Sequence, residues 1–111
     1  MHVRTLLSAF AVLLTACGGA LSRGESQFAG GSYPEAKETF ASLEAESRTW
    51  DDRQRAEYAL YRGLTLAALG DRDHAGPWLR QARAIEEAHP GTLSQENVQR
   101  LRVGLESSDA Q

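Results

Sequence analysis

The spacing of apolar residues in the second half of the chain predicts two helices of different character. Residues 52–69 carry two apolar stripes at helical spacing, which indicates a helix that packs on both sides. Residues 74–88 carry one stripe with charged residues opposite, which indicates a helix on the outside of the fold. The stripes of the first helix are Leu60, Leu64 and Ala67, and Tyr58, Tyr61, Leu66 and Leu69; the stripe of the second is Ala75, Trp78, Leu79, Ala82 and Ile85.

Capping signals predict two further helices and mark where the helices begin. Ser32 followed by Glu35 matches a capping box, and Pro34 suits a first helical turn, so we expect a helix over residues 34–47. Ser94 precedes another apolar pattern, which predicts a final helix to residue 106 and a polar tail over 107–111. The caps expected for the two central helices are Thr49 or Asp51 and Asp71 or Asp73.

Residues 18–31 support two interpretations. Five of these 14 residues are glycine, which disfavours a helix by about 1 kcal/mol per glycine. The register of the repeat described next favours a helix over residues 20–29, whereas composition favours a flexible linker.

A ladder of glycine and apolar residues recurs at a displacement of 39 residues. Its members are Gly24, Gly31, Ala36, Phe40 and Leu43 in one copy, and Gly63, Gly70, Ala75, Leu79 and Ala82 in the other. This spacing resembles the tetratricopeptide repeat, a helix-turn-helix unit with a usual period of 34 residues. The resemblance implies that the first glycine lets helix A approach the alanine of helix B, and that the second glycine forms the turn.

The extra length of the repeat falls around residues 49–53, between the two units. The sequence therefore predicts an all-α domain over residues 32–106, made of two tetratricopeptide-like helix-turn-helix units and a C-terminal capping helix. That last helix is expected to cover the open end of the stack.

The N-terminus carries a short apolar segment that ends at the single cysteine. Arg4 supplies a positive end, and residues 6–14 are apolar except for Ser8, a run too short to span a bilayer. Leu14, Thr15, Ala16 and Cys17 then resemble the lipobox of bacterial lipoproteins. The resemblance implies that residues 1–16 are a signal peptide and that Cys17 takes a diacylglycerol. Residues 17–31 would then form a lipidated N-terminus with a linker or a weak first helix.

An ordinary secretory signal, cut after Ala16 or Ala20, is the alternative interpretation of this segment. If the segment is a lipoprotein signal, the residue after the cysteine indicates the membrane. In the lipoproteins that it resembles, an aspartate at this position favours the inner membrane; this chain has Gly18 there, so we expect the outer membrane.

Charge and composition argue against several functional classes. Removal of residues 1–16 leaves 11 basic and 15 acidic side chains, with a formal charge of −4. The charges are interspersed, without the basic cluster that nucleic-acid binding requires. We find no pair of carboxyl groups on an apolar floor, no phosphate loop and no nucleophile constellation, so the sequence predicts neither an enzyme nor a small-molecule substrate.

The histidines do not form a metal site in the sequence. Asp71, Asp73 and His74 lie together, but they lack a second cluster at zinc or calcium spacing. We expect no metal and no cofactor apart from the acyl lipid on Cys17.

The candidate partner-binding residues follow from the resemblance to tetratricopeptide repeats, in which helix A lines the groove. The corresponding positions are Glu57, Leu60, Leu64, Ala67 and Ala68, and they lack the lysine and asparagine of the carboxylate clamp. An amphipathic helix or a neighbouring subunit would suit such an apolar surface, unless the last helix of the chain fills it. Trp50 is a further candidate anchor, with packing under its own loop as the alternative.

These observations lead to two functional hypotheses. The first is a lipoprotein that is attached to the membrane through its lipid and acts as a small protein-protein interaction adaptor or assembly factor in the bacterial cell envelope. The second is a structural, self-associating envelope lipoprotein without a separate client. In both hypotheses the protein binds the membrane through its lipid. Its protein partner is another envelope protein in the first hypothesis and a second copy of the chain in the second.

Overall fold

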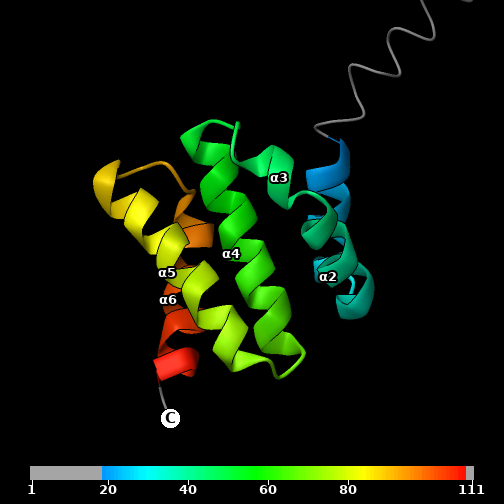
Figure 1. The fold of residues 1–111 in the computed structure, drawn as a ribbon. Coiled ribbons are helices and arrows are strands. Elements are labelled where there is room, and N and C mark those ends of the chain that lie inside the picture. The colour runs from blue at the N-terminus through cyan, green and yellow to red at the C-terminus, as the bar shows by residue number, and fades with distance from the viewer. Residues whose placement is uncertain (1–18, 110–111) are drawn as a thin grey trace, which may run out of the picture.

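Residues 19–109, which the computed structural model describes, form helices joined by short turns, and this part of the chain contains no strand (Figure 1). A first helix covers residues 19–29. It is followed by α2 (Tyr33–Ser42), α3 (Glu44–Ser47), α4 (Asp52–Ala68), α5 (Arg72–Ala88) and α6 (Gln95–Asp109). The predicted signal peptide and Cys17 lie outside the described residues.

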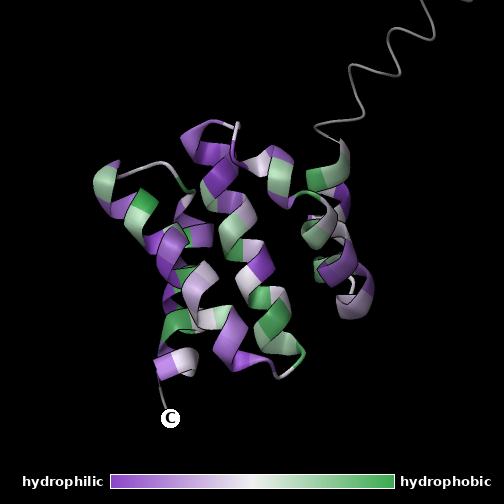
Figure 2. Cartoon of the chain, viewed as in Figure 1, coloured by the Kyte–Doolittle hydropathy of each residue, from purple (hydrophilic) through white to green (hydrophobic). Residues whose placement is uncertain are grey.

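Helix α4 is the centre of the fold, as its two apolar stripes predict. It contacts α2, α5 and α6, and Figure 1 shows it between α2 on one side and α5 on the other. Figure 2 shows hydrophobic segments recurring along α4 between hydrophilic ones. Leu60 and Leu64 of one stripe pack into one apolar cluster and Tyr58 of the other stripe packs into a second, so the prediction of a helix packed on both sides is confirmed. Leu69, at the end of the second stripe, is an exception because it is 40% exposed.

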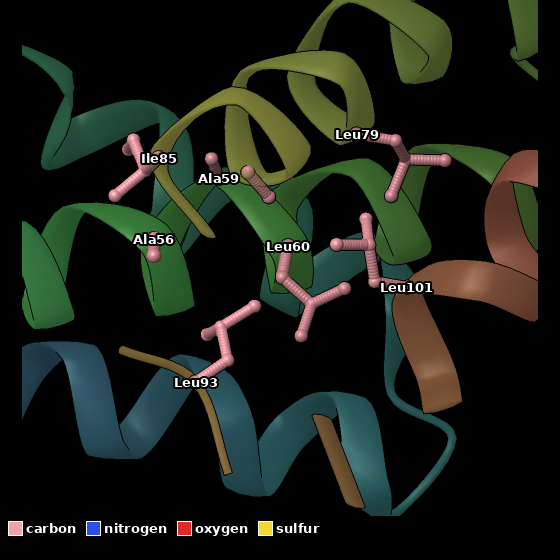
Figure 3. Packing of buried hydrophobic residues seen from close by; sticks show 8 residues of the cluster. Ala56, Ala59, Leu60, Leu79, Ile85, Leu93 and Leu101 are labelled. Atoms are coloured by element: carbon pink, nitrogen blue, oxygen red, sulfur yellow. The ribbon is translucent and has the colours of Figure 1, made fainter. Parts of the chain in front are cut away.

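The larger cluster joins α4, α5 and α6. Leu60 and Leu79 are fully buried in it, and Leu93 and Leu101 close it from the α5–α6 loop and from α6 (Figure 3). The other buried members are Ala56, Ala59, Ala82 and Ile85. Because α5 and α6 both pack on α4 here, this cluster fixes the three helices against one another.

The smaller cluster joins the first helix, α2 and α4. Phe40 and Tyr58 are its largest buried side chains, and their rings meet edge to face at 6.0 Å. The hydroxyl group of Tyr58 donates a hydrogen bond of 2.6 Å to the carbonyl of Phe40, so the buried polar atom is satisfied.

Two helix pairs use glycine in the same way at positions 39 residues apart. A Cβ atom on Gly24 would lie 2.5 Å from the ring of Phe40, and one on Gly63 would lie 2.7 Å from Leu79. Only glycine permits these close approaches. The nearest residues are thus Phe40 and Leu79, which corrects the expectation that the glycines face the alanines of the partner helices.

The turn after each of these helices also matches its counterpart. Gly31 and Gly70 have φ angles of 81° and 83°, in the left-handed region that favours glycine. The amides at 31 and 32 bond to the carbonyls of residues 28 and 27, and those at 70 and 71 bond to residues 67 and 66. Both helices therefore end in a Schellman motif.

The first helix resolves the choice between a helix and a linker in favour of the helix. Leu21 is buried against the smaller cluster, and Gly24 sits directly on Phe40. Tertiary packing on α2 and α4 thus outweighs the low helix propensity of the glycines.

Two helix boundaries and one cap predicted from the sequence are wrong. The helix expected over residues 34–47 breaks at Leu43, whose amide bonds three residues back to Phe40 and tightens the last turn of α2. Ser32 makes no capping hydrogen bond, because its backbone is not in the extended conformation that a cap requires. Helix α6 continues to Asp109, so most of the expected polar tail is helical.

Three other side chains do cap the helices that follow them. Asp51 accepts a hydrogen bond of 2.8 Å from the amide of Gln54 and caps α4, as expected. Asp71 caps α5, which begins at Arg72, two residues earlier than predicted. Ser94 accepts a bond of 3.2 Å from the amide of Asn97 and caps α6.

Candidate binding groove

Tyr61 occupies the middle of a face formed by three helices. Its ring meets Phe28 of the first helix edge to face at 5.6 Å, and its hydroxyl group lies 3.2 Å from Oδ1 of Asn97 on α6. Burial raises the pKa of Tyr61, so the hydroxyl group stays protonated at neutral pH. Tyr61 therefore contacts both helices that flank α4. Two hollows lie on this face, one lined by residues before and including Tyr61 on α4 and the other by residues after it.

The first hollow, which we call the apolar groove, has a volume of about 610 Å³. Its apolar lining comes from Phe28 of the first helix, from α4 and from α6. Val103 is 60% exposed there, one of two large hydrophobic side chains that are exposed in the described part of the chain. At the rim Arg100 pairs with Glu96 at 2.5 Å. The other lining residues used below are Leu64, Ala67, Ala68 and Gly104.

The second hollow, which we call the polar groove, has a volume of about 510 Å³ and lies on the other side of Tyr61. Glu25 from the first helix and Glu57 from α4 both line it, together with Asn97 and the loop over residues 91–94. Arg53 pairs with Glu57 at 3.2 Å, but the Arg53 side chain is 77% exposed. The polar groove therefore contains two carboxyl groups with one weakly held counter-ion.

The carboxyl group of Glu25 is strongly perturbed. Burial, the negative charge of Glu57 and a side-chain hydrogen bond to Glu57 together raise the pKa of Glu25 to about 7. Oε1 of Glu25 is inaccessible to solvent and has no hydrogen-bond partner among the described residues. The sequence analysis found no pair of carboxyl groups on an apolar floor; the structure does bring Glu25 and Glu57 together, in a hollow lined mainly by polar residues.

Four of the six partner-binding candidates line these hollows. Glu57 lines the polar groove, and Leu64, Ala67 and Ala68 line the apolar groove. Leu60 does not line either hollow, because it is fully buried between Leu93 and Leu101 (Figure 3). The last helix thus fills the predicted groove at position 60 and leaves it open from position 64 onward.

Trp50 lies away from both grooves. Its ring packs edge-on against Tyr58 at 5.7 Å, and Tyr58 packs in the same way against Trp78. Arg62 lies over the ring of Trp78 at 4.4 Å and donates hydrogen bonds to Tyr58 and Glu44. Trp50 is therefore part of the packing beneath its loop, which was the alternative interpretation of this residue.

Sequence reasoning missed Glu25, Phe28, Tyr61 and Asn97 as groove residues. The repeat itself contained a signal for two of them, because subtracting 39 from Leu64 and Ala67 gives Glu25 and Phe28. The positions of Tyr61 and Asn97 depend on how α6 packs against α4, which the repeat does not specify.

A second apolar hollow lies between α5 and α6, with a volume of about 640 Å³. Val98, Leu101 and Leu105 form its floor. Its rim carries charged side chains of both signs, which are Arg83, Glu87, Arg102 and Glu106.

Two further observations concern metal sites and membrane spans. In residues 19–109 no cluster of three or more potential metal ligands is present, and His74 instead lies 2.9 Å from Asp71, where this contact lowers the pKa of the aspartate. Within the same range we find no helix with the length and apolar character needed to cross a membrane.

Comparison of the chain with family models, with curated proteins and with solved structures finds no match.

Proposed function

We propose that this chain is a lipid-anchored adaptor of the bacterial cell envelope that holds a helical segment of another envelope protein in the apolar groove. In this proposal the protein is a binding protein and not an enzyme. Cys17 supplies the attachment to the membrane, and the helical domain supplies the docking surface.

The lipobox-like sequence Leu14 to Cys17 supports the anchor. Two or three acyl chains on Cys17, at about 0.8 kcal/mol per buried methylene, would make a stable attachment. Only Gly18 separates Cys17 from the first described helical residue, so the domain would lie close to the bilayer. The outer membrane remains the location we propose, because Gly18 follows the cysteine.

The matching use of glycine supports a tetratricopeptide-like repeat. Gly24 and Gly63 both permit close helix contacts, and Gly31 and Gly70 both end a helix in a left-handed turn. The first helix and α4 would then be the A helices of two units, with α6 following as a third helix of that kind. Such helices line the inner groove in the family that the sequence resembles.

The observation that carries the proposal is the open apolar groove itself. Three helices from distant parts of the chain form it, and Val103 stays exposed in it although a hydrophobic side chain gains about 25 cal/mol per Å² from burial. An amphipathic helix laid into such a groove would bury Val103, Leu64 and Phe28.

The test is site-specific photo-crosslinking in cells. We expect a crosslinker at Ala68, in the apolar groove, to capture one envelope protein, and to do so only when Cys17 is intact. Ala84 is an exposed alanine of α5 outside the grooves, and it provides the matched control position. Equal products at positions 68 and 84, or no product at 68, would contradict the adaptor.

Self-association is a second candidate function, favoured by the hollow between α5 and α6. Its apolar floor and its rim of both charges would be complementary to a second copy of the same surface. A crosslinker at Arg102 that captures a differently tagged copy of the chain, with no capture at Ala68, would establish this alternative.

A further inference from the structure

The two sides of α6 face different hollows. One side lines the hollow between α5 and α6 with a stripe of residues three or four apart, which we call the outer stripe: Val98, Arg102, Leu105 and Asp109. The other side, which includes Val103, lines the apolar groove. No described residue of α6 lines both hollows. A molecule that covers the outer stripe therefore leaves the apolar groove open.

The apolar floor of the hollow between α5 and α6 is not fully covered by the chain itself. Leu101 is buried, but Val98 and Leu105 are only partly buried where they pack against the larger cluster. Charged side chains surround this floor at the rim. An apolar centre within a polar rim is the usual make-up of a protein–protein interface.

The charges at the rim have few partners within the chain. Arg102 donates a hydrogen bond to the neutral Gln99, and among residues 19–109 neither Arg102 nor Glu106 takes part in an ion pair. Arg83 and Glu87 approach only to 4.0 Å, with side chains that are 46% and 72% exposed. These charges are therefore available to a second molecule.

Two of the arginines lie level with each other on opposite walls of the hollow. A Cβ atom on Gly76 would lie 3.5 Å from Oγ of Ser108, so α5 and α6 are in contact there. Since the two helices run antiparallel, Arg83, seven residues after Gly76, comes level with residue 101, next to Arg102. The middle of the hollow is thus positive on both walls, and it fits a carboxylate from the molecule that docks there.

The outer stripe itself supplies such a carboxylate when it meets a second copy of α6. Its residues are arranged symmetrically about a point between positions 103 and 104, so two copies can interdigitate antiparallel across a two-fold axis. Arg102 of one copy then lies beside Leu105 and Glu106 of the other, and the same contact occurs twice. A parallel arrangement would bring Arg102 against Arg102 and is disfavoured by like-charge repulsion.

We propose that two copies of the chain pair through the hollow between α5 and α6, with antiparallel α6 helices and with Glu106 of each copy between Arg83 and Arg102 of the other. The apolar groove of each copy stays open, so the pair has two docking surfaces. This pairing goes beyond the proposed function, because it requires neither a client in the groove nor the lipid on Cys17. It also differs from self-association without a client, since both grooves remain free.

The test is co-capture of two differently tagged copies of the full chain, expressed together and extracted in mild detergent. We expect the natural copies to recover each other. Arg102→Glu paired with itself should reduce this recovery about tenfold, and Glu106→Arg paired with itself should do the same, because symmetry turns two attractive contacts into repulsive ones. Absence of co-capture between natural copies, or full recovery in both single variants, would overturn the proposal.

Mixing the two variants gives the decisive comparison. A copy with Arg102→Glu and a copy with Glu106→Arg have opposite charges at both contacts, so their mixture should recover to the level of the natural chain. Misfolding of either variant would not be repaired by mixing, and both residues are exposed. A mixture that recovers no better than the single variants would refute the antiparallel contact.

A matched pair of charge reversals provides the control. Lys37→Glu and Glu38→Arg change neighbouring exposed residues of α2, away from the hollow, and should leave co-capture unchanged. A reduction as large as that of Arg102→Glu would show a general charge effect and would also refute the proposed interface.

Failure of this pairing is distinguishable from failure of the adaptor. A client captured at Ala68 without co-capture of copies would retain the adaptor and remove the pair. Co-capture that follows the charge pattern, with no client at Ala68, would retain the pair and remove the adaptor.

Discussion

At the scale of single residues, burial decides what otherwise similar side chains do. Leu60 and Leu64 belong to the same apolar stripe, yet Leu60 is fully buried and Leu64 lines an open groove. Glu25 and Glu38 are both helical glutamates, yet only Glu25 meets a second carboxyl group in a partly buried site. These differences come from α6 and the first helix, which cover some positions of α4 and α2 and leave others exposed.

The raised pKa of Glu25 leads to a prediction about stability and pH. The folded chain keeps a proton on Glu25 up to about pH 7, whereas the unfolded chain loses it near the ordinary value of 4.5. The free energy of unfolding should therefore fall as pH rises through this window, by on the order of 1 kcal/mol after allowing for solvent screening. Urea unfolding at pH 5 and pH 8 measures this change.

The variant Glu25→Gln should lose this part of the pH dependence, because glutamine does not ionise. Glu38→Gln, at an exposed position, should retain the full dependence of the natural chain. The same loss of stability in the natural chain and in Glu25→Gln would rule out Glu25 as its source.

At the scale of the elements, glycine contacts decide how closely the helices pack. Gly24 lets the first helix sit on Phe40, and Gly63 lets α4 sit on Leu79. The length and position of α4 followed from its apolar stripes and from the cap at Asp51. The helix break at Leu43 could not be predicted from such signals, because a local 3₁₀-type hydrogen bond and the burial of that leucine decide it.

The contact at Gly63 can be tested with an alanine substitution. A methyl group on residue 63 would lie 2.7 Å from Cγ of Leu79 and 3.2 Å from its backbone nitrogen, so the helices must move apart. We expect Gly63→Ala to lower the free energy of unfolding by about 1–3 kcal/mol through overpacking, less about 1 kcal/mol of gained helix propensity. Urea unfolding measures the net loss.

A double-mutant cycle provides the control. In a Leu79→Ala background most of the overlap is removed, so Gly63→Ala should cost less than it does in the natural chain. Additive effects of the two substitutions would show that the contact with Leu79 is not the cause.

At the scale of the whole molecule, α6 completes both the core and the groove. Leu101 covers Leu60 and Leu79, while Gly104 and Val103 of the same helix border the open groove. Gly104 lies close to Leu64, where an added Cβ would approach within 3.0 Å. One helix therefore closes the hydrophobic core and shapes the candidate binding surface.

Removal of α6 should consequently unfold more than that helix. A chain that ends at Ser94 exposes Leu60 and Leu79, and loss of such buried contacts costs about 2–5 kcal/mol for each large side chain. We expect the circular dichroism signal to fall by more than the 15 residues of α6 account for, and the cooperative urea transition to disappear. A chain that ends at Glu106 lacks only polar and small residues and should behave like the natural chain. Retention of the transition in the shorter chain would contradict this role of α6.

The sequence by itself determined the helical class, the central position of α4 and the glycine turns. Each of these depends on local spacing: two apolar stripes require packing on both sides, and Gly31 and Gly70 end their helices with positive φ angles. The sequence also located four residues of the groove lining, because the repeat places them on one face of α4.

Only the tertiary structure decided which of those positions stay open and which side chains join them. The pairing of Glu25 with Glu57, the link from Tyr61 to Asn97 and the burial of Leu60 all join residues that are distant in the chain. Such contacts depend on the relative placement of the first helix, α4 and α6. Hydrophobic spacing within one helix specifies which face is buried, but packing between helices specifies what that face meets.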